Sequence, residues 1–114
     1  MIIAYALPIL PGQAGRAKRF GPELEESGHR AAYDELNRLA TVRRQVHFVQ
    51  SFPSGDLQIV AFDVEDPSRL GRAFTDSAYD QWWLDYLRDV HGLDIRAMPE
   101  PPPPPGLTFD STAG

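Results

Sequence analysis

The sequence predicts an α+β domain whose elements follow the order β-α-β-β-α-β. Three observations lead to this prediction: an apolar run rich in branched residues opens the chain, two β-rich runs flank a short turn, and two segments with helical periodicity separate the strands. A chain of 114 residues that is 42% apolar is sized for one domain with its own core. We therefore expect a single domain over residues 1–98, followed by a proline-rich arm over residues 99–114.

The first strand and the first helix are predicted from the N-terminal third of the chain. Ile2–Ile9 is an apolar run that stops before Pro11-Gly12, which suits a central strand. From Gln13 to Ala40, small and apolar residues recur at steps of three and four, the spacing of one long amphipathic helix. Gly21-Pro22 lies near the start of this segment and predicts either a kink or a short first turn followed by the main helix from Pro22.

Residues 43–52 and 56–65 are predicted to form a β-hairpin, because both are rich in β-formers and the Pro-Ser-Gly-Asp sequence between them is a turn signal. With Ser54-Gly55 as the loop, His47 is expected opposite Phe62. Both faces of the hairpin are largely apolar, a pattern typical of strands that are covered on both sides.

The most regular pattern lies in residues 76–92, where aromatic and aliphatic side chains share one helical face. These side chains are Tyr79, Trp82, Trp83, Tyr86, Leu87 and Val90. Gly92 suits the left-handed residue that ends many helices. Asp66-Pro67-Ser68 predicts an earlier helix start, and the alternation in residues 93–98 predicts a short edge strand.

This order of elements matches the split arrangement of a ferredoxin-like antiparallel sheet, with both helices on one face. The other face would be bare, and burial stabilises apolar side chains such as Phe48 and Ile59 by roughly 25 cal/mol per Å². We therefore expect a second copy of the chain to cover that face, so that the protein is a homodimer. Leu107 and Phe109 would anchor the arm as a strap over the partner; the alternative is a disordered tail.

A set of short motifs accompanies this order of elements. They are Pro11-Gly12, Glu23-Leu24, Tyr33-Asp34-Glu35, Pro53-Ser-Gly-Asp56, Asp80-Gln-Trp-Trp83 and His91-Gly92. Over roughly residues 1–98 the chain resembles the dimeric α/β-barrel superfamily, and short bacterial members of unknown function above all. The resemblance implies two ferredoxin-like sheets that face each other in a homodimer. The superfamily includes cofactor-free monooxygenases, polyketide cyclases, haem enzymes and stress-response proteins, so it selects no reaction and transfers no catalytic residue.

His47 is the main candidate for catalysis, since a histidine in mid-strand beside an apolar pocket can act as a general base for enolisation or phenol deprotonation. The alternative is a core histidine with one hydrogen-bonded nitrogen. We expect a cleft between the helices and the sheet to hold an aromatic substrate. The residues predicted to line it are Tyr5, Phe62, Tyr79, Trp83 and Tyr86. The same aromatic stripe can also be plain core.

Three further titratable positions have structural expectations of their own. His91 ends the second helix and is expected to bond its last carbonyls, with haem ligation as the alternative. His29 has acidic neighbours and is expected at the surface. Asp63 is expected on an apolar strand face, where a buried carboxylate needs a partner such as Arg44 or Arg96, or else a raised pKa; the alternative is a salt bridge at the edge or at an interface. The histidines lack metal-binding spacing, so no metal site is predicted.

Composition narrows the classes of function. A net charge of −5 without a run of basic residues argues against nucleic acid as a partner. The first apolar run is too short for a membrane span and lacks a basic lead-in, so we expect a cytoplasmic protein with no membrane partner. The absence of cysteine excludes thiol catalysis.

The sequence therefore predicts a homodimeric, cofactor-independent enzyme of the cyclase, isomerase or monooxygenase type. Its substrate would be a compact aromatic or polyketide-like molecule, bound under the helix of residues 76–92. One alternative is a non-catalytic dimer that binds a ligand or a partner protein. The other is a haem-binding member with His91 or His47 as the ligand.

Overall fold

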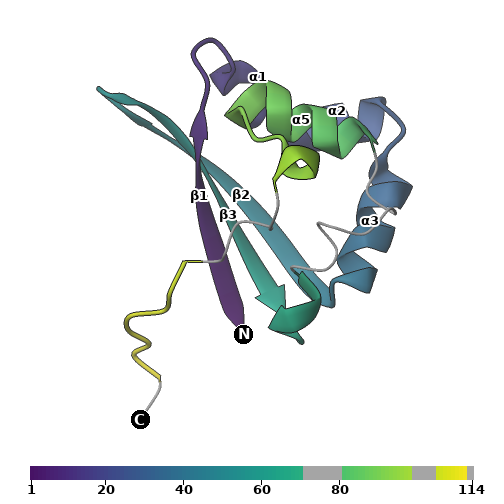
Figure 1. Cartoon of the computed structure of the whole chain (residues 1–114), viewed down its shortest axis with the longest axis vertical. Helices are drawn as coiled ribbons and strands as arrows, with labels where there is room; N and C mark the ends of the chain where they lie inside the picture. Colours follow the sequence, from purple (N-terminus) through teal and green to yellow (C-terminus); the bar gives the residue numbers. More distant parts are fainter. Residues whose placement is uncertain (71–80, 99–104, 113–114) are drawn as a thin grey trace.

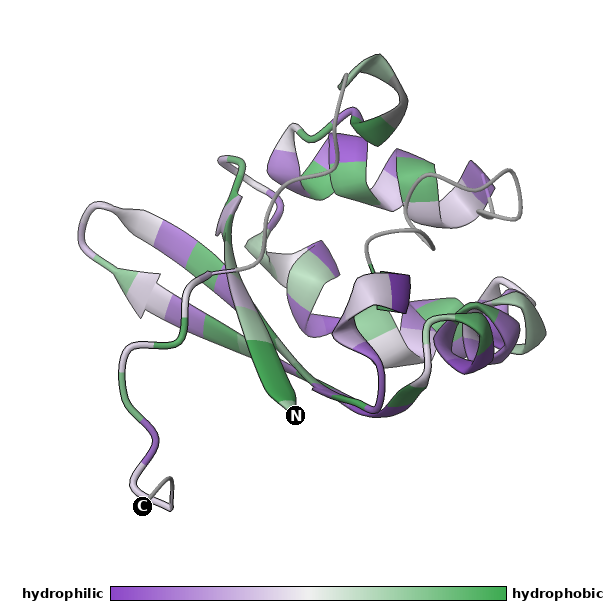
Figure 2. Ribbon diagram, turned by 60° about the horizontal axis from the view of Figure 1, so that its bottom comes forward, coloured by the Kyte–Doolittle hydropathy of each residue, from purple (hydrophilic) through white to green (hydrophobic). Residues whose placement is uncertain are grey.

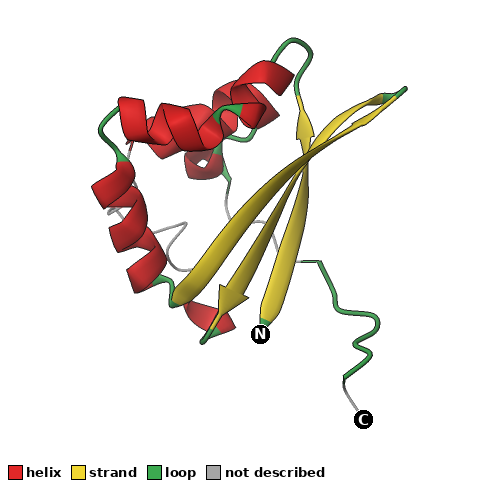
Figure 3. Cartoon of the chain, turned by 180° about the vertical axis from the view of Figure 1, so that it is seen from behind, coloured by secondary structure: helices red, strands yellow, loops and turns green. Residues whose placement is uncertain are grey.

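A three-stranded antiparallel sheet carries the fold, with helices packed on one of its faces (Figures 1 and 3). A computed structural model describes residues 1–70, 81–98 and 105–112. β3 (Gly55–Val64) lies between β1 (Ile2–Ile9) and β2 (Val42–Phe52). Because β1 and β2 are each antiparallel to β3, they run parallel to each other with a strand between them. The predicted α+β class is confirmed.

The hairpin of β2 and β3 is confirmed, but its predicted register is wrong by two residues. Phe52 pairs with Gly55, so the loop is Pro53-Ser54, and His47 lies opposite Val60 rather than Phe62. Gly55 begins β3 at φ 144°, a conformation that favours glycine, which places it after the turn instead of inside it. A shift of two residues keeps every side chain on its predicted face of the sheet.

The single long helix predicted between β1 and β2 is wrong, because the segment folds as α1 (Ala14–Lys18), α2 (Phe20–Glu26) and α3 (Arg30–Leu39). The first break falls before Pro22 and not at it. Proline has no N–H to bond the carbonyl four residues earlier, so a continuous helix would fail there, whereas the first turn of a new helix accepts proline. The second break contains Gly28 at φ 77°, a left-handed conformation.

α5 (Gln81–His91) forms the described part of the predicted aromatic helix, whose expected start at residue 76 lies outside the described residues. Gly92 ends it at φ 70°, and the Leu93 N–H donates to the Leu87 carbonyl at 3.1 Å. The predicted left-handed end is therefore confirmed. The earlier helix start is confirmed as well, since residues 67–70 are helical and Asp66 Oδ1 accepts from the Ser68 N–H at 3.1 Å.

The edge strand predicted over residues 93–98 is wrong, because this segment contains a short 3-10 helix, η1 (Ile95–Ala97). The Asp94 carboxylate accepts a hydrogen bond from the Ala97 N–H at 3.3 Å, which favours a helical turn over an extended chain. Ile95 is buried against Leu84 of α5. The alternation of the sequence thus reflects a turn that packs one apolar side chain on a helix.

The core lies between the sheet and the helices. Alternate side chains of β3, from Gln58 to Val64, are buried on this side. One cluster joins them to Ile3 of β1 and Ala40 after α3, and a second joins Ile9 to residues of α1, α2 and α5. In Figure 1, α1, α2 and α5 lie together over one end of the sheet, and α3 lies beside the other end.

The opposite face of the sheet is open and apolar in the described parts of the chain. Ile2 is 70% exposed and Phe48 is 58% exposed, and Figure 3 shows the drawn helices on one side of the sheet. Hydrophobic residues dominate the N-terminal half of β1 (Figure 2). Asp63 also lies on this face and is 42% exposed, with the Met1 amino group 3.5 Å away. A buried carboxylate with an arginine partner is therefore wrong for Asp63 in the single chain, and the alternative expectation of a salt bridge fits, with the N-terminus as the partner.

Residues 105–112, the described part of the C-terminal arm, lie away from the sheet in Figures 1 and 3. Leu107 is 71% exposed and Phe109 is 79% exposed, so neither is packed into the domain of its own chain. Their role as anchors on a partner stays a prediction. Across the described ranges, no helix combines the length and the apolar character that a bilayer crossing requires.

Candidate functional site

His47 is held in one orientation by two amides and an aromatic ring. Its side chain lies on the helix-facing side of β2 and stacks on Phe20 of α2, with ring centroids 4.4 Å apart. Nδ1 lies 2.9 Å from Nε2 of Gln58, and Nε2 lies 2.6 Å from Oε1 of Gln45. These contacts fix the rotation of the imidazole, which is a requirement for a group that moves a proton.

The contacts of His47 continue into a buried polar chain. Gln58 Oε1 accepts from the Tyr86 hydroxyl at 2.9 Å and lies 2.9 Å from Nε2 of His91. Nδ1 of His91 lies 2.8 Å from the carbonyl oxygen of Pro8, which can only accept. The structure therefore joins two distant histidines through one glutamine. The expectation that His91 bonds the last carbonyls of its own helix is wrong.

This polar chain admits two arrangements of protons. With the Gln58 carbonyl turned towards His91, that histidine donates from both nitrogens and is charged, and His47 carries its proton on Nε2. With the Gln58 amide rotated, its NH₂ group donates to Nε2 of a neutral His91, and its carbonyl oxygen accepts from the N–H at Nδ1 of His47. In the first arrangement the Tyr86 hydroxyl donates its proton to Oε1 of Gln58. In the second arrangement the amide NH₂ group faces Tyr86, and the hydroxyl proton has no acceptor on Gln58. The protonation of His91 thus sets which nitrogen of His47 holds a proton.

Burial favours the neutral form of both histidines. It lowers the pKa of His47 to about 4, with the nearby His91 as a smaller cause. Burial also lowers the pKa of His91, against an opposing hydrogen bond to the Pro8 carbonyl. Near pH 7 both rings are neutral, which selects the arrangement with the proton of His47 on Nδ1. Nε2 then carries the lone pair, and because it lies 2.6 Å from Oε1 of Gln45, which can only accept, the Gln45 amide must rotate as well and present its NH₂ group.

A cleft of about 510 Å³ opens beside His47, between α1, α2, α3 and β2. Gln45 and Val49 line it from the strand, as do Lys18 and Arg30 from the helix side. Tyr33 of α3 also lines it, and burial raises the pKa of this tyrosine to about 12. The cleft is large enough for a small organic molecule and combines apolar walls with a few polar groups, as ligand sites do.

Those predicted substrate-binding residues that the structure describes do not line this cleft. Tyr5, Phe62 and Trp83 line a separate apolar slot of about 50 Å³ between the sheet, α5 and η1. Tyr86 is 1% exposed, its hydroxyl is bonded to Gln58, and burial raises its pKa to about 12. Tyr79 lies outside the described residues. The structure therefore places His47 at a cleft and its expected aromatic partners in or beside the core.

The aromatic residues of α5 support the site from behind. Tyr86 lies parallel to Trp83 with ring centroids 5.8 Å apart, and Phe20 meets Tyr86 edge-on at 5.1 Å. Phe20 also stacks on His47, so the aromatic cluster buttresses the imidazole. His29, expected at the surface, is partly buried and stacks on Trp82 at 5.6 Å.

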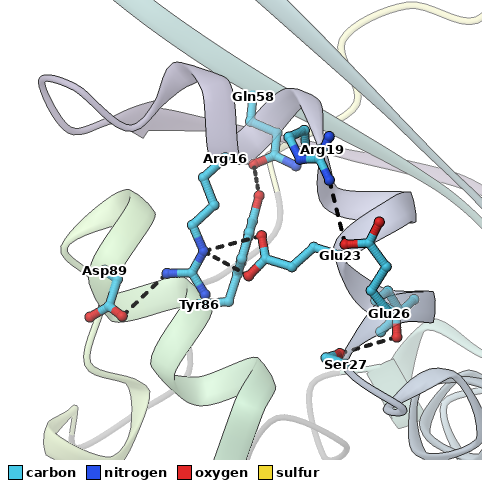
Figure 4. Close-up of polar contacts among 9 residues, drawn as sticks. Arg16, Arg19, Glu23, Glu26, Ser27, Gln58, Tyr86 and Asp89 are labelled. Carbon is cyan, nitrogen blue, oxygen red and sulfur yellow. Dashed lines mark hydrogen bonds and ion pairs between the residues drawn. The ribbon is translucent and has the colours of Figure 1, made fainter.

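Arg16 of α1 joins α2 and α5 through its guanidinium group (Figure 4). Its Nε donates to Glu23 of α2 at 2.9 Å, and Nη1 donates to Asp89 of α5 at 3.3 Å. The guanidinium also lies 5.3 Å from the centre of the Tyr86 ring. Arg16 therefore fixes α5 over the polar chain that Tyr86 enters.

The sequence indicated Gln58 only weakly as part of the site. It lies on the predicted face of His47, because both occupy helix-facing positions of the hairpin. A buried glutamine in an otherwise apolar alternation is the signal, since a buried amide requires partners. The involvement of His91 had no such signal, because its contact with β1 joins residues far apart in the chain.

Comparison with known protein families, with curated proteins and with solved structures gave no match for this chain. Among the described residues, no group of three or more histidine or acidic side chains gathers in a way that could hold a metal ion.

Proposed function

We propose that the protein is a cofactor-independent small-molecule enzyme in which His47 acts as a general base on a compact aromatic or polyketide-like substrate. The observation that supports this most is the polar chain of Gln45, His47, Gln58 and His91 beside the cleft of about 510 Å³. It orients the imidazole and gives it a defined tautomer, the role that a second residue plays for catalytic histidines generally.

The lowered pKa of His47 defines the reaction that it can perform. A base with a pKa of about 4 is unprotonated throughout the neutral range, but it accepts protons weakly. It therefore suits substrates with an acidic proton, such as a phenol or the carbon between two carbonyl groups of a polyketide. Cyclase, isomerase and monooxygenase reactions on such molecules share this first step of proton removal.

Hydrogen–deuterium exchange at an activated carbon tests this step without knowledge of the natural substrate. We expect the protein to accelerate the exchange of the α-protons of 2-tetralone in D₂O, followed by NMR. His47→Asn should abolish the acceleration while circular dichroism and the melting temperature stay close to those of the wild type. Gln50→Asn, an exposed amide on the open side of β2, is the matched control and should exchange like the wild type.

A non-catalytic ligand-binding protein is the second candidate. One observation favours it: both nitrogens of His47 are occupied by side chains of the protein itself. Under this function aromatic ligands would bind the cleft with no exchange of their protons. Both nitrogens of His91 are occupied as well, which disfavours haem ligation, and titration with hemin should give no sharp Soret band.

We further propose that two copies pair through the open face of the sheet and form a ferredoxin-like dimeric α/β barrel. The exposed apolar side chains of this face support the proposal. Complete burial of a phenylalanine side chain is worth about 1.5–3 kcal/mol, so covering Phe48, now 58% exposed, would contribute about 1–2 kcal/mol. In the described sheet β1 and β2 are the two edge strands, and the outer edge of each pairs with no other described strand.

Sedimentation equilibrium tests the dimer. The wild type should be dimeric at micromolar concentration, and Phe48→Lys should dissociate it because the substitution places a charge on the apolar face. Ala31→Lys, at an exposed position of α3 away from the open face of the sheet, is the control and should leave the dimer intact. A well-folded wild-type monomer at these concentrations would overturn the proposed assembly.

A further inference from the structure

A second hollow adjoins the cleft beside His47. It has a volume of about 450 Å³ and lies between α3 and the first residues of β2. The two hollows share Arg30, Tyr33 and Gln45 in their walls. The two hollows therefore adjoin, and together we call them the α3–β2 groove, with linings from the end of α1 to the start of β2.

Three cations in the walls of the α3–β2 groove have no acidic partner. Lys18 lines the first hollow, and Arg43 and Arg44 line the second. Throughout the described ranges, none of the three forms an ion pair. Arg30 and Arg38, by contrast, are paired with acids of α2 and α3. The groove is thus electropositive although the whole chain carries a net charge of −5.

A β-bulge places the two unpaired arginines together. The pairing of β2 with β3 shifts between Val42 and Arg44, which inserts one extra residue into β2. Bulges re-aim side chains at the ends of strands, and here Arg43 and Arg44 are both exposed and both line the second hollow, although Arg44 pairs in the sheet with Asp63 of the open face. A regular strand would direct two neighbouring side chains to opposite faces.

We propose that the α3–β2 groove binds a compact aromatic molecule that carries a carboxylate or a phosphate. The anionic group would lie between Arg43 and Arg44, because guanidinium groups bind both kinds of anion through paired N–H donors. The ring would lie in the adjoining hollow, beside Tyr33 and His47. This inference rests on the proposed function, since it names the substrate class of the same cleft.

The single lysine of the chain provides a probe inside the groove. Reductive methylation with ¹³C-formaldehyde labels Lys18 and the N-terminal amine and keeps the positive charge of the lysine. We expect 4-phenylbutyrate and phenyl phosphate to shift the Lys18 signal and to leave the N-terminal signal in place. The neutral 4-phenylbutan-1-ol should bind at least about tenfold more weakly, and added salt should reduce the difference.

Two double variants with equal charge separate the groove from the charge of the whole chain. Arg43→Gln with Arg44→Gln should weaken both anionic probes about tenfold or more and leave the alcohol unchanged. Arg19→Gln with Arg88→Gln removes two cations that line neither hollow and should leave all three affinities unchanged.

Equal affinity for the alcohol and the anions, or equal effects of the two double variants, would overturn the inference. These measurements are made at equilibrium and do not depend on turnover. The proposed function is tested separately by proton exchange in His47→Asn, which should still bind 4-phenylbutyrate. A wild type that exchanges protons but shows no preference for anions would refute the ligand class alone.

Discussion

Replacing Gln58 with leucine should be one of the most destabilising single changes in the sheet. The glutamine is 1% exposed and its amide contacts Tyr86, His91 and His47, each at 2.9 Å. Leucine is similar in size to glutamine, so the substitution leaves little empty space. The loss of stability comes instead from the hydrogen-bond partners of Gln58, which lose their contacts. The Tyr86 hydroxyl and Nε2 of His91 would remain buried without a partner, and His47 would lose the contact that sets its tautomer.

The magnitude follows from these orphaned groups. A buried polar group left without a hydrogen bond costs about 1–3 kcal/mol, so two or three of them predict a loss of about 3–5 kcal/mol in the free energy of unfolding. That is a large share of the free energy of unfolding of a whole domain, which is typically about 5–15 kcal/mol. Tyr86→Phe removes only one hydrogen bond and should cost about 1 kcal/mol.

Urea titration followed by tryptophan fluorescence measures these losses, because Trp82 and Trp83 both stack on Tyr86. Gln50→Leu, at an exposed position of β2, is the control and should change the free energy of unfolding by no more than about 0.5 kcal/mol. A loss below about 1 kcal/mol for Gln58→Leu, or a larger loss for Tyr86→Phe, would refute the view that Gln58 links the polar chain.

Three further predictions concern pH and the helices. The pKa of His47 is about 4 in the folded protein and about 6.5 in an unfolded chain. The stabilising contribution of the neutral ring is therefore complete above pH 6.5, and the free energy of unfolding should fall by up to about 3 kcal/mol as the pH drops to 4. In urea titrations, His47→Gln should flatten this pH dependence. Gly92→Ala should lower the free energy of unfolding by about 1 kcal/mol in thermal melts, because Gly92 has a φ of 70°, which disfavours residues with a Cβ atom. Gly15→Ala, in a helix with open space around it, is the control and should cause no such loss. Equal effects of the two substitutions would contradict this account. Arg16→Met should lower the free energy of unfolding by about 1 kcal/mol at low salt and by less at high salt, because salt screens its ion pairs with Glu23 and Asp89. A loss of stability that does not depend on salt would show that these ion pairs contribute nothing.

The strands were predictable because their signals are local. β1 has the predicted bounds, and the hairpin follows from two β-rich runs around a turn. The register could not be fixed, because the turn sequence allows either Pro53-Ser54 or Ser54-Gly55 as the loop. Only the positive φ of Gly55 in the folded chain decides between them.

The helical segment shows where periodicity misleads. Apolar residues keep helical spacing across both breaks between α1, α2 and α3, because all three helices pack on the same core. The spacing therefore records burial on one side and not continuity of the backbone. The same limit explains residues 93–98, whose alternation arises from a turn with Ile95 packed on α5.

The candidate site was predicted in part. The choice of His47 needed only its position on a strand face, and the structure places it at a cleft. Its partners come from distant elements: Gln58 from β3 and His91 from the end of α5. Such contacts depend on how the helices lie over the sheet, which no local pattern encodes. The aromatic residues were assigned to the substrate because a stripe that lines a ligand and one that fills a core look alike in sequence.

The hairpin constrains how the length of its loop can change during evolution. Adding or removing a pair of residues next to Pro53-Ser54 would slide β2 along β3 and keep the imidazole on the inner surface. An odd change, absorbed by a slip of the strand, would turn His47 outward and bring Phe48 inward. Relatives that share this chemistry should therefore differ in loop length only by even numbers.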